Sequence, residues 1–265
     1  MDLFAGTADY YDRFRPGVPS ELVTRVVAEA GRFSLAHSLL DIGTGTGKVL
    51  EQFLPYFKDI IAIEPDTDML EHAKHRLIPQ MSAEASIFFL DGSIEIVQFP
   101  PNWSASLVTI CRAFHWLDQP TALKRLDTIL EARGVIAIMG DQSFWTLNNP
   151  WTTEVRTIVQ QFLGETRRAG NSVYNEPTGE ITEVLQQSAF SYVESFIVPV
   201  TRTWTAQQIL GYLYSTSFAA PRLFEDRRED FERVLLDKLH RMMPNNKFIE
   251  ENQFEVILAR RPFAY

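Results

Sequence analysis

Apolar and polar positions follow two alternating rhythms along the first half of this 265-residue chain. Short apolar runs predict buried strands, and apolar residues at helical spacing between those runs predict helices. Strands are expected at 38–42, 60–64, 87–90, 105–112 and 135–139, helices at 21–31, 46–57, 66–77 and 120–130, and a turn at Arg133 and Gly134. This strand–helix alternation favours a parallel sheet with right-handed crossovers.

The rhythm breaks after Gly140. Residues 141–185 read as a loop-like, aromatic-rich segment that ends in a helix at 179–188. A sixth strand (192–200), two helices (205–217 and 227–243) and a last strand (253–259) are expected beyond it. We therefore expect one Rossmann-like domain over residues 1–265. Residues 1–20 would form an N-terminal lid, and 141–185 and 203–250 a helical cap that recognises the substrate; both 1–20 and 141–185 should gain protection when ligand binds.

The most informative motif follows the first expected strand. In the run from Asp41 to Gly47, glycines at alternate positions let the chain turn sharply and admit a ligand against bare main chain. The amides that open the following helix can face an anionic group. Glu64 ends the next strand, and an acid about 20 residues past a glycine turn is placed to accept hydrogen bonds from a ribose. The pattern predicts a nucleoside site, and a glycine-rich turn without a ligand is the alternative.

Two other nucleotide-binding motifs do not fit this run. A dinucleotide fingerprint requires glycine where this chain has Lys48. A P-loop requires glycine where it has Ile42, and serine or threonine where it has Val49. The carboxylate of Asp41 would repel a pyrophosphate but could pair with an ammonium group.

The pattern Asp-x-Gly-x-Gly-x-Gly resembles the first motif of class I S-adenosylmethionine (SAM) methyltransferases, whose ligand carries an adenosine, an ammonium group and no phosphate. The chain is similar to their type 11 small-molecule branch at residues 11–16, 41–47, 61–69, 92–95, 113–116 and 133–134. The resemblance keeps the family's motif order over residues 1–140 and weakens over 141–250. It implies an α/β, Rossmann-like seven-stranded sheet, with six parallel strands plus an antiparallel last strand, flanked by helices. It also implies SAM as cofactor, S-adenosylhomocysteine as product, and a small-molecule acceptor methylated at oxygen, nitrogen or carbon, with specialised metabolism as one setting.

The resemblance further implies a set of cofactor-binding residues around the glycine loop. Asp41 and the loop would hold the methionine moiety, Glu64 the ribose diol, and Pro65 and Met69 the adenine. The full set is Tyr11, Arg15, Asp41, Gly43, Thr44, Gly45, Gly47, Glu64, Pro65, Met69, Asp91, Ser93, Ile94 and Arg112.

Two parts of that set have particular roles. Either Ser93 or Asp91 would accept a hydrogen bond from the adenine amino group, while the Ile94 amide donates to the ring. Tyr11 and Arg15 resemble N-terminal residues that close over the SAM carboxylate, which a guanidinium can bind bidentately.

On the acceptor side, His115 follows the fourth expected strand at the sheet edge where open α/β folds bind ligands. It is the candidate catalytic base for a phenol, enol or amine acceptor, whereas a carboxylate acceptor needs none. A purely structural histidine is the alternative. The candidate substrate residues are Tyr10, His115, Trp116, Trp145, Tyr174 and Tyr214. Aromatic residues of the cap could equally form its core.

Composition and charge limit the cellular compartment and the classes of partner that we expect. The single cysteine, Cys111, excludes intrachain disulfides and cysteine-rich zinc sites, so we expect a cytoplasmic protein without a metal. A net charge of −9 argues against a nucleic-acid substrate. No apolar stretch approaches the ~18 residues of a membrane span, so no membrane partner is expected. A SAM-binding protein that no longer transfers methyl and an RNA or protein methyltransferase stay open as alternatives, and the oligomeric state is undetermined.

Overall fold

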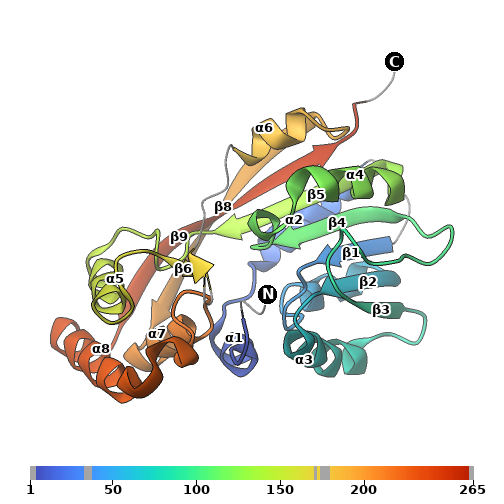
Figure 1. The fold of residues 1–265 in the computed structure, drawn as a ribbon. Helices are drawn as coiled ribbons and strands as arrows, with labels where there is room; N and C mark the ends of the chain where they lie inside the picture. Colours follow the sequence, from blue (N-terminus) through green and yellow to red (C-terminus); the bar gives the residue numbers. More distant parts are fainter. Residues whose placement is uncertain (1–3, 33–37, 170–171, 174–179, 263–265) are drawn as a thin grey trace. The chain divides into compact units, whose positions relative to one another are not determined.

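The central element is a seven-stranded β-sheet (Figure 1). The computed structural model describes residues 4–32, 38–169, 172–173 and 180–262, and its strand order is β3-β2-β1-β4-β5-β9-β8. The strands are β1 (Ser38–Ile42), β2 (Asp59–Glu64), β3 (Ser86–Asp91), β4 (Ala105–Cys111), β5 (Leu130–Asp141), β8 (Tyr192–Trp204) and β9 (Phe248–Arg260). Six strands are parallel, and the last one, β9, is antiparallel and lies between β5 and β8. The predicted fold class is therefore confirmed.

The remaining elements are mostly helices, and the chain forms two compact units. The helices are α1 (Ala8–Phe14), α2 (Ser20–Gly31), α3 (Thr67–Leu77), α4 (Gln119–Ile129), α5 (Pro150–Leu163), α6 (Ile181–Gln186), α7 (Ala206–Tyr214) and α8 (Arg228–Met242). Strands β6 (Arg168–Ala169) and β7 (Ser172–Val173) form a small antiparallel pair. The sheet unit comprises Gly17–Gly140, Pro177–Val198 and Phe254–Tyr265; the helical unit comprises Met1–Pro16, Asp141–Glu176 and Pro199–Gln253.

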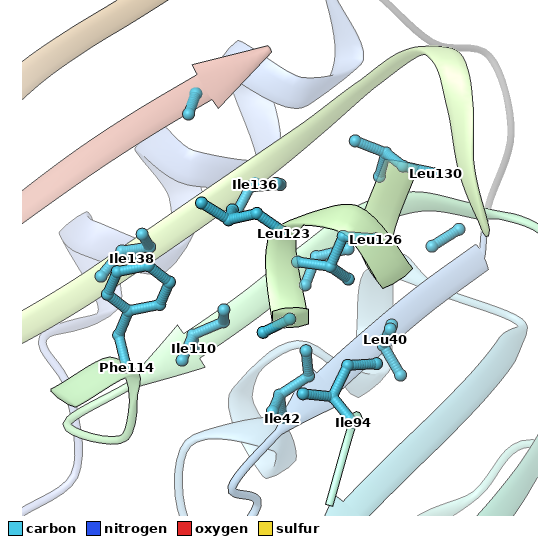
Figure 2. Close-up of a cluster of buried hydrophobic side chains, with 14 of the residues drawn as sticks. Leu40, Ile42, Ile94, Ile110, Phe114, Leu123, Leu126, Leu130, Ile136 and Ile138 are labelled. Atoms are coloured by element: carbon cyan, nitrogen blue, oxygen red, sulfur yellow. The ribbon is translucent and has the colours of Figure 1, made fainter. Parts of the chain in front are cut away.

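The inner parallel strands carry the core of the sheet unit. β1 and β4 are buried at every position, as expected for parallel strands covered on both faces. Ile42 of β1 pairs in register with Ile110 of β4, and both side chains share one cluster with Leu123 and Leu126 of α4 (Figure 2). This packing fixes the strand register, which brings the carboxyl ends of β1, β2 and β4 to one edge of the sheet.

An aromatic core holds the helical unit together. The Phe144 ring lies 4.9 Å from Trp151, 5.1 Å from Trp204 and 4.0 Å from Tyr212, measured between ring centroids. Other fully or nearly fully buried aromatic members are Tyr214, Phe218, Phe224, Phe231 and Phe248. The unit therefore has its own apolar interior.

The expectation that residues 141–185 are loop-like before residue 179 is wrong, because α5 occupies residues 150–163. A capping box between Asn149 and Thr152 begins this helix, and its apolar face joins the aromatic core. Residues 1–20 likewise contain α1, which packs on α7 at Gly211, where an added Cβ would lie 2.4 Å from the Phe14 ring. Both helices depend on partners far away in sequence.

The predicted helix at 46–57 is also wrong. The segment forms two short 3₁₀ turns, η1 (Leu50–Gln52) and η2 (Leu54–Tyr56). Gly47 has a left-handed φ of +79°, and Pro55 lacks the amide that a longer helix would use. Consequently no α-helix begins directly after the glycine loop, and the expected anion site made of helix N-terminal amides does not form there.

The turn predicted at Arg133 and Gly134 lies inside β5 as an irregularity of its pairing with β4. Ala105 pairs with Leu130 but Leu107 pairs with Val135, so β5 carries extra residues between these two pairs. A Cβ on Gly134 would lie 2.6 Å from the Leu130 side chain, which explains the glycine. The other predicted elements are present, β1 with the predicted bounds and the rest with shifted ends.

Candidate functional site

The glycine loop leaves β1 with three residues in the left-handed region. The φ angles are +70° at Gly43, +55° at Gly45 and +79° at Gly47. The amides of Gly43 and Thr44 both donate to the Ile63 carbonyl of β2, at 2.9 and 3.0 Å. A Cβ on Gly43 would lie 2.5 Å from the Cβ of Ala113, so only glycine fits between the loop and the segment after β4.

Glu64 ends β2 beside this loop. Its Oε2 accepts a hydrogen bond from the Gly45 amide at 2.8 Å, and its Oε1 accepts one from the Asp66 amide at 3.0 Å. The side chain is almost completely buried, and burial raises the pKa of this carboxyl to about 7 even though the two amides act in the opposite direction. Two amides occupy only some of the lone-pair positions of this carboxylate, so it can accept further hydrogen bonds from a diol.

Asp41 lies deeper, on β1. Asp41 is 2% exposed. Its Oδ2 accepts a hydrogen bond from the Thr44 hydroxyl at 2.5 Å, and its Oδ1 accepts one from the Thr109 hydroxyl at 2.6 Å. Burial raises the pKa of this carboxyl, and the two hydroxyls oppose the rise. The structure thus shows Asp41 bound to neighbouring side chains, and its pairing with the ammonium of a ligand stays a prediction.

The residues that follow Glu64 lead into α3. Pro65 is exposed, and Asp66 caps the helix by accepting from the Met69 amide at 3.0 Å. The Met69 side chain is buried. The cap fixes the spacing between Glu64 and Met69, while the adenine contacts of Pro65 and Met69 stay predictions.

The end of β3 lies next to Glu64. Asp91 is exposed and pairs in register with Glu64. The backbone carbonyl of Glu64 accepts a hydrogen bond from the Gly92 amide at 3.2 Å. Ser93 follows at a partly buried position, and the Ile94 side chain is completely buried in the cluster of Figure 2. Both candidates for the adenine amino group therefore lie on one loop beside Glu64, and the choice between them stays open.

The segment after β4 carries the candidate base. Arg112 has a left-handed φ of +57°, and its guanidinium lies 5.2 Å from the centroid of the Phe254 ring. A 3₁₀ turn, η4 (Phe114–Trp116), then presents His115 and Trp116, both partly buried, with ring centroids 4.8 Å apart. A strained non-glycine residue often marks a functional segment. The contact of Ala113 with the glycine loop places this segment beside the candidate cofactor site.

The other candidate residues belong to the helical unit and form a set of their own. The Arg15 guanidinium donates to the Tyr212 hydroxyl at 3.0 Å and lies 5.2 Å from the Tyr11 ring centroid. Tyr10 packs edge-on against Tyr214 with the ring centroids 5.2 Å apart.

Tyr214 lies in the interior of the helical unit and donates to Glu232 at 2.9 Å; burial raises the pKa of its phenol. Trp145 packs against Phe218 at 5.3 Å between ring centroids. Tyr174 lies outside the described residues. Ligand roles for these residues stay predictions.

Sequence reasoning missed Thr109. Its hydroxyl is the partner of Asp41, and the residue is completely buried. A polar residue in the middle of a largely apolar strand was the available signal. Pairing of the first and fourth strands was needed to show which acid it meets.

A glycine loop and a strand-end acid at the carboxyl edge of this sheet define a nucleoside-binding, Rossmann-like protein. The sequence model of a family described as a methyltransferase domain matches residues 40–138. An uncharacterised methyltransferase of Oceanobacillus iheyensis is 32% identical over 156 residues, covering 55% of this chain and 68% of that protein. One of Mycobacterium tuberculosis is 24% identical over 231 residues, covering 87% of this chain and 83% of that protein.

A solved structure, the YcgJ protein of Bacillus subtilis, shares the fold with a TM-score of 0.58 at 15% identity, covering 92% of this chain and all of that one. The chain belongs to the SAM-dependent methyltransferase family, and it is an enzyme of that class whose cofactor is SAM.

The residues present fit this cofactor. The left-handed glycines leave bare main chain beside the buried Glu64 carboxylate, which suits a ribose diol. Within the described ranges, no three His, Cys, Asp or Glu side chains group as metal ligands, and no helix has the length and apolar character needed to cross a bilayer.

Proposed function

We propose that this methyltransferase transfers the methyl group of SAM to a small organic acceptor, at oxygen, nitrogen or carbon. The observation that carries the proposal is the pair of partly buried rings, His115 and Trp116, on the turn after β4, whose Ala113 lies against the glycine loop. Aromatic side chains with a few polar groups are typical of sites for small organic molecules. Residues 1–20, 141–185 and 203–250 are the segments to which we assign acceptor recognition and closure.

The charge of the chain supports a small acceptor over a nucleic acid. At −9 overall, the protein would repel a polyanion unless a local basic stripe compensated. Several arginines of the helical unit instead lie on its own rings, as with Arg15 and Tyr212 at 4.8 Å and Arg228 and Tyr214 at 5.0 Å. These contacts favour aromatic packing over phosphate binding.

The chemistry assigned to the chain is mostly positioning. When bound, SAM supplies an activated methyl group. Glu64 would accept from the ribose hydroxyls, and the glycine loop would hold the methionine part, so that the methyl group faces one direction. His115 would take a proton from a phenol, enol or amine acceptor, whereas a carboxylate acceptor would need only orientation by the same side chain.

The test is an untargeted screen. A metabolite extract is incubated with the enzyme and methyl-labelled SAM, and products are sought that carry the label and a SAM-dependent increase of one methylene in mass. The matched control is Glu64→Ala, which should abolish the products. A labelled small molecule made only by the wild type supports the proposal.

The alternatives give different results. SAM binding by calorimetry without any labelled product would favour a protein that no longer transfers methyl. Label found in RNA or protein, with tight RNA binding at physiological salt, would favour a macromolecular acceptor.

A further inference from the structure

The strongest unassigned feature is the buried pair of Asp41 and Thr109. The two residues are direct partners in the parallel register of β1 and β4, and their row of the sheet continues into Ala62 of β2 and Ala137 of β5. Alternate strand positions face opposite sides, so this row points away from the aliphatic cluster that contains Ile42. The carboxyl group of Asp41 therefore lies beside small apolar neighbours, and within the described part of the chain hydroxyl groups are its hydrogen-bond donors.

Thr44 supplies the second hydroxyl. Thr44 lies in the glycine loop, and the residue is 5% exposed. The carboxylate thus bridges a fixed residue of β4 and a residue of the loop, with donor–acceptor distances of 2.6 and 2.5 Å. A buried carboxyl that loses a hydrogen-bond partner is costly, so the two hydrogen bonds of this bridge restrain the loop.

We propose that Thr109 is a positioning residue for SAM: through Asp41 and Thr44 it holds the glycine loop in the conformation that receives the cofactor. Thr109 need not touch the ligand for this. The Gly43–Ala113 approach ties the same loop to the segment after β4 a second time. Both ties start from β4, the strand that also leads to His115, so the cofactor loop and the candidate base share one support.

The test compares Thr109→Val, which keeps the shape and removes the hydroxyl, with Thr109→Ser, which keeps the hydroxyl. The matched control is Ser106→Ala, which deletes another buried hydroxyl on β4 whose partner is the Ser38 carbonyl at 2.6 Å, away from the loop. Calorimetry measures the dissociation constant of S-adenosylhomocysteine at pH 8, above the Glu64 pKa of about 7. Hydrogen exchange follows the amides of residues 43–47, and thermal melting reports the stability without ligand.

We expect Thr109→Val to weaken binding about tenfold and to speed exchange of the loop amides, because the buried carboxylate loses one of two hydroxyl donors. Thr109→Ser should restore binding, and Ser106→Ala should lower the melting temperature without weakening binding.

Wild-type affinity and wild-type exchange in a folded Thr109→Val protein would overturn the proposal. So would an equal loss of affinity in Ser106→Ala, because that would show a general effect of strand stability. If Thr109→Val does not fold, Thr44→Val removes the other hydroxyl from Asp41, and unchanged affinity in that variant refutes the bridge.

Discussion

The buried carboxylate of Glu64 should make the affinity for the cofactor depend on pH. In the ligand-free protein its pKa is raised to about 7, with burial as the main cause. Ribose hydroxyls donate to the ionised form and stabilise it. Below pH 7 the protein must therefore release a proton to bind the ligand, and we expect the affinity to fall as the pH falls.

The size of the effect follows from that pKa. The dissociation constant rises by the factor 1 + 10^(pKa − pH), which is about 1.1 at pH 8 and about 11 at pH 6, so binding should weaken roughly tenfold. The free energy of unfolding without ligand should change in the opposite direction. Because the folded pKa of about 7 lies above the ordinary value of 4.5, folding takes up a proton between these pH values. Stability should then fall by about 3 kcal/mol at most as the pH rises through this interval.

The assay is calorimetric titration of S-adenosylhomocysteine at pH 6, 7 and 8. Glu64→Gln should bind weakly with little pH dependence, and its stability should lose the decline between pH 5 and 7. Glu64→Ala should lose on the order of 3 kcal/mol of binding free energy while keeping the fold. Glu71→Gln is the matched control, because that glutamate is exposed on α3 and pairs with Lys74.

Two results would refute the reasoning. One is a wild-type dissociation constant that stays constant between pH 6 and pH 8. The other is a folded Glu64→Ala protein with wild-type affinity, which would show that the carboxylate does not contact the ligand.

Other substitutions test the remaining parts of the site and fold. His115→Ala should lower turnover with little change in cofactor affinity and remove one limb of the pH–rate profile near neutrality, or raise the acceptor KM if the acceptor is a carboxylate; unaltered kinetics would make His115 a packing residue. Gly43→Ala should weaken cofactor binding in calorimetry, because the added methyl would lie 2.5 Å from the Ala113 Cβ at a residue whose φ is +70°; unchanged binding would mean that the loop can shift freely. Gly211→Ala should reduce the free energy of unfolding by about 2 kcal/mol and so lower the melting temperature, because its methyl would meet the Phe14 ring at 2.4 Å. An unchanged melting curve would show that α1 moves away without loss of stability.

Local sequence determined the sheet strands and brought out the glycine loop and Glu64 as candidate cofactor residues. The strand at 38–42 and the acid at Glu64 were predictable because apolar runs, alternate glycines and a strand-end carboxylate are short-range patterns. The antiparallel last strand came from the family resemblance, and the structure places it between β5 and β8. Helical spacing predicted an α-helix after the glycine loop, but the structure forms 3₁₀ turns there. The left-handed conformation of Gly47 and the missing amide of Pro55 prevent the hydrogen bonds of a longer helix.

Only the tertiary structure decided which polar groups meet. Thr109 reaches Asp41 across 68 residues of sequence, and the Gly45 amide reaches Glu64 across 19. The same packing removes these carboxylates from water and raises their pKa values, an effect that no local pattern carries. Helix α5 was missed for a related reason: its apolar face is stabilised by rings from other segments, and the energy of a short helix comes mainly from such packing.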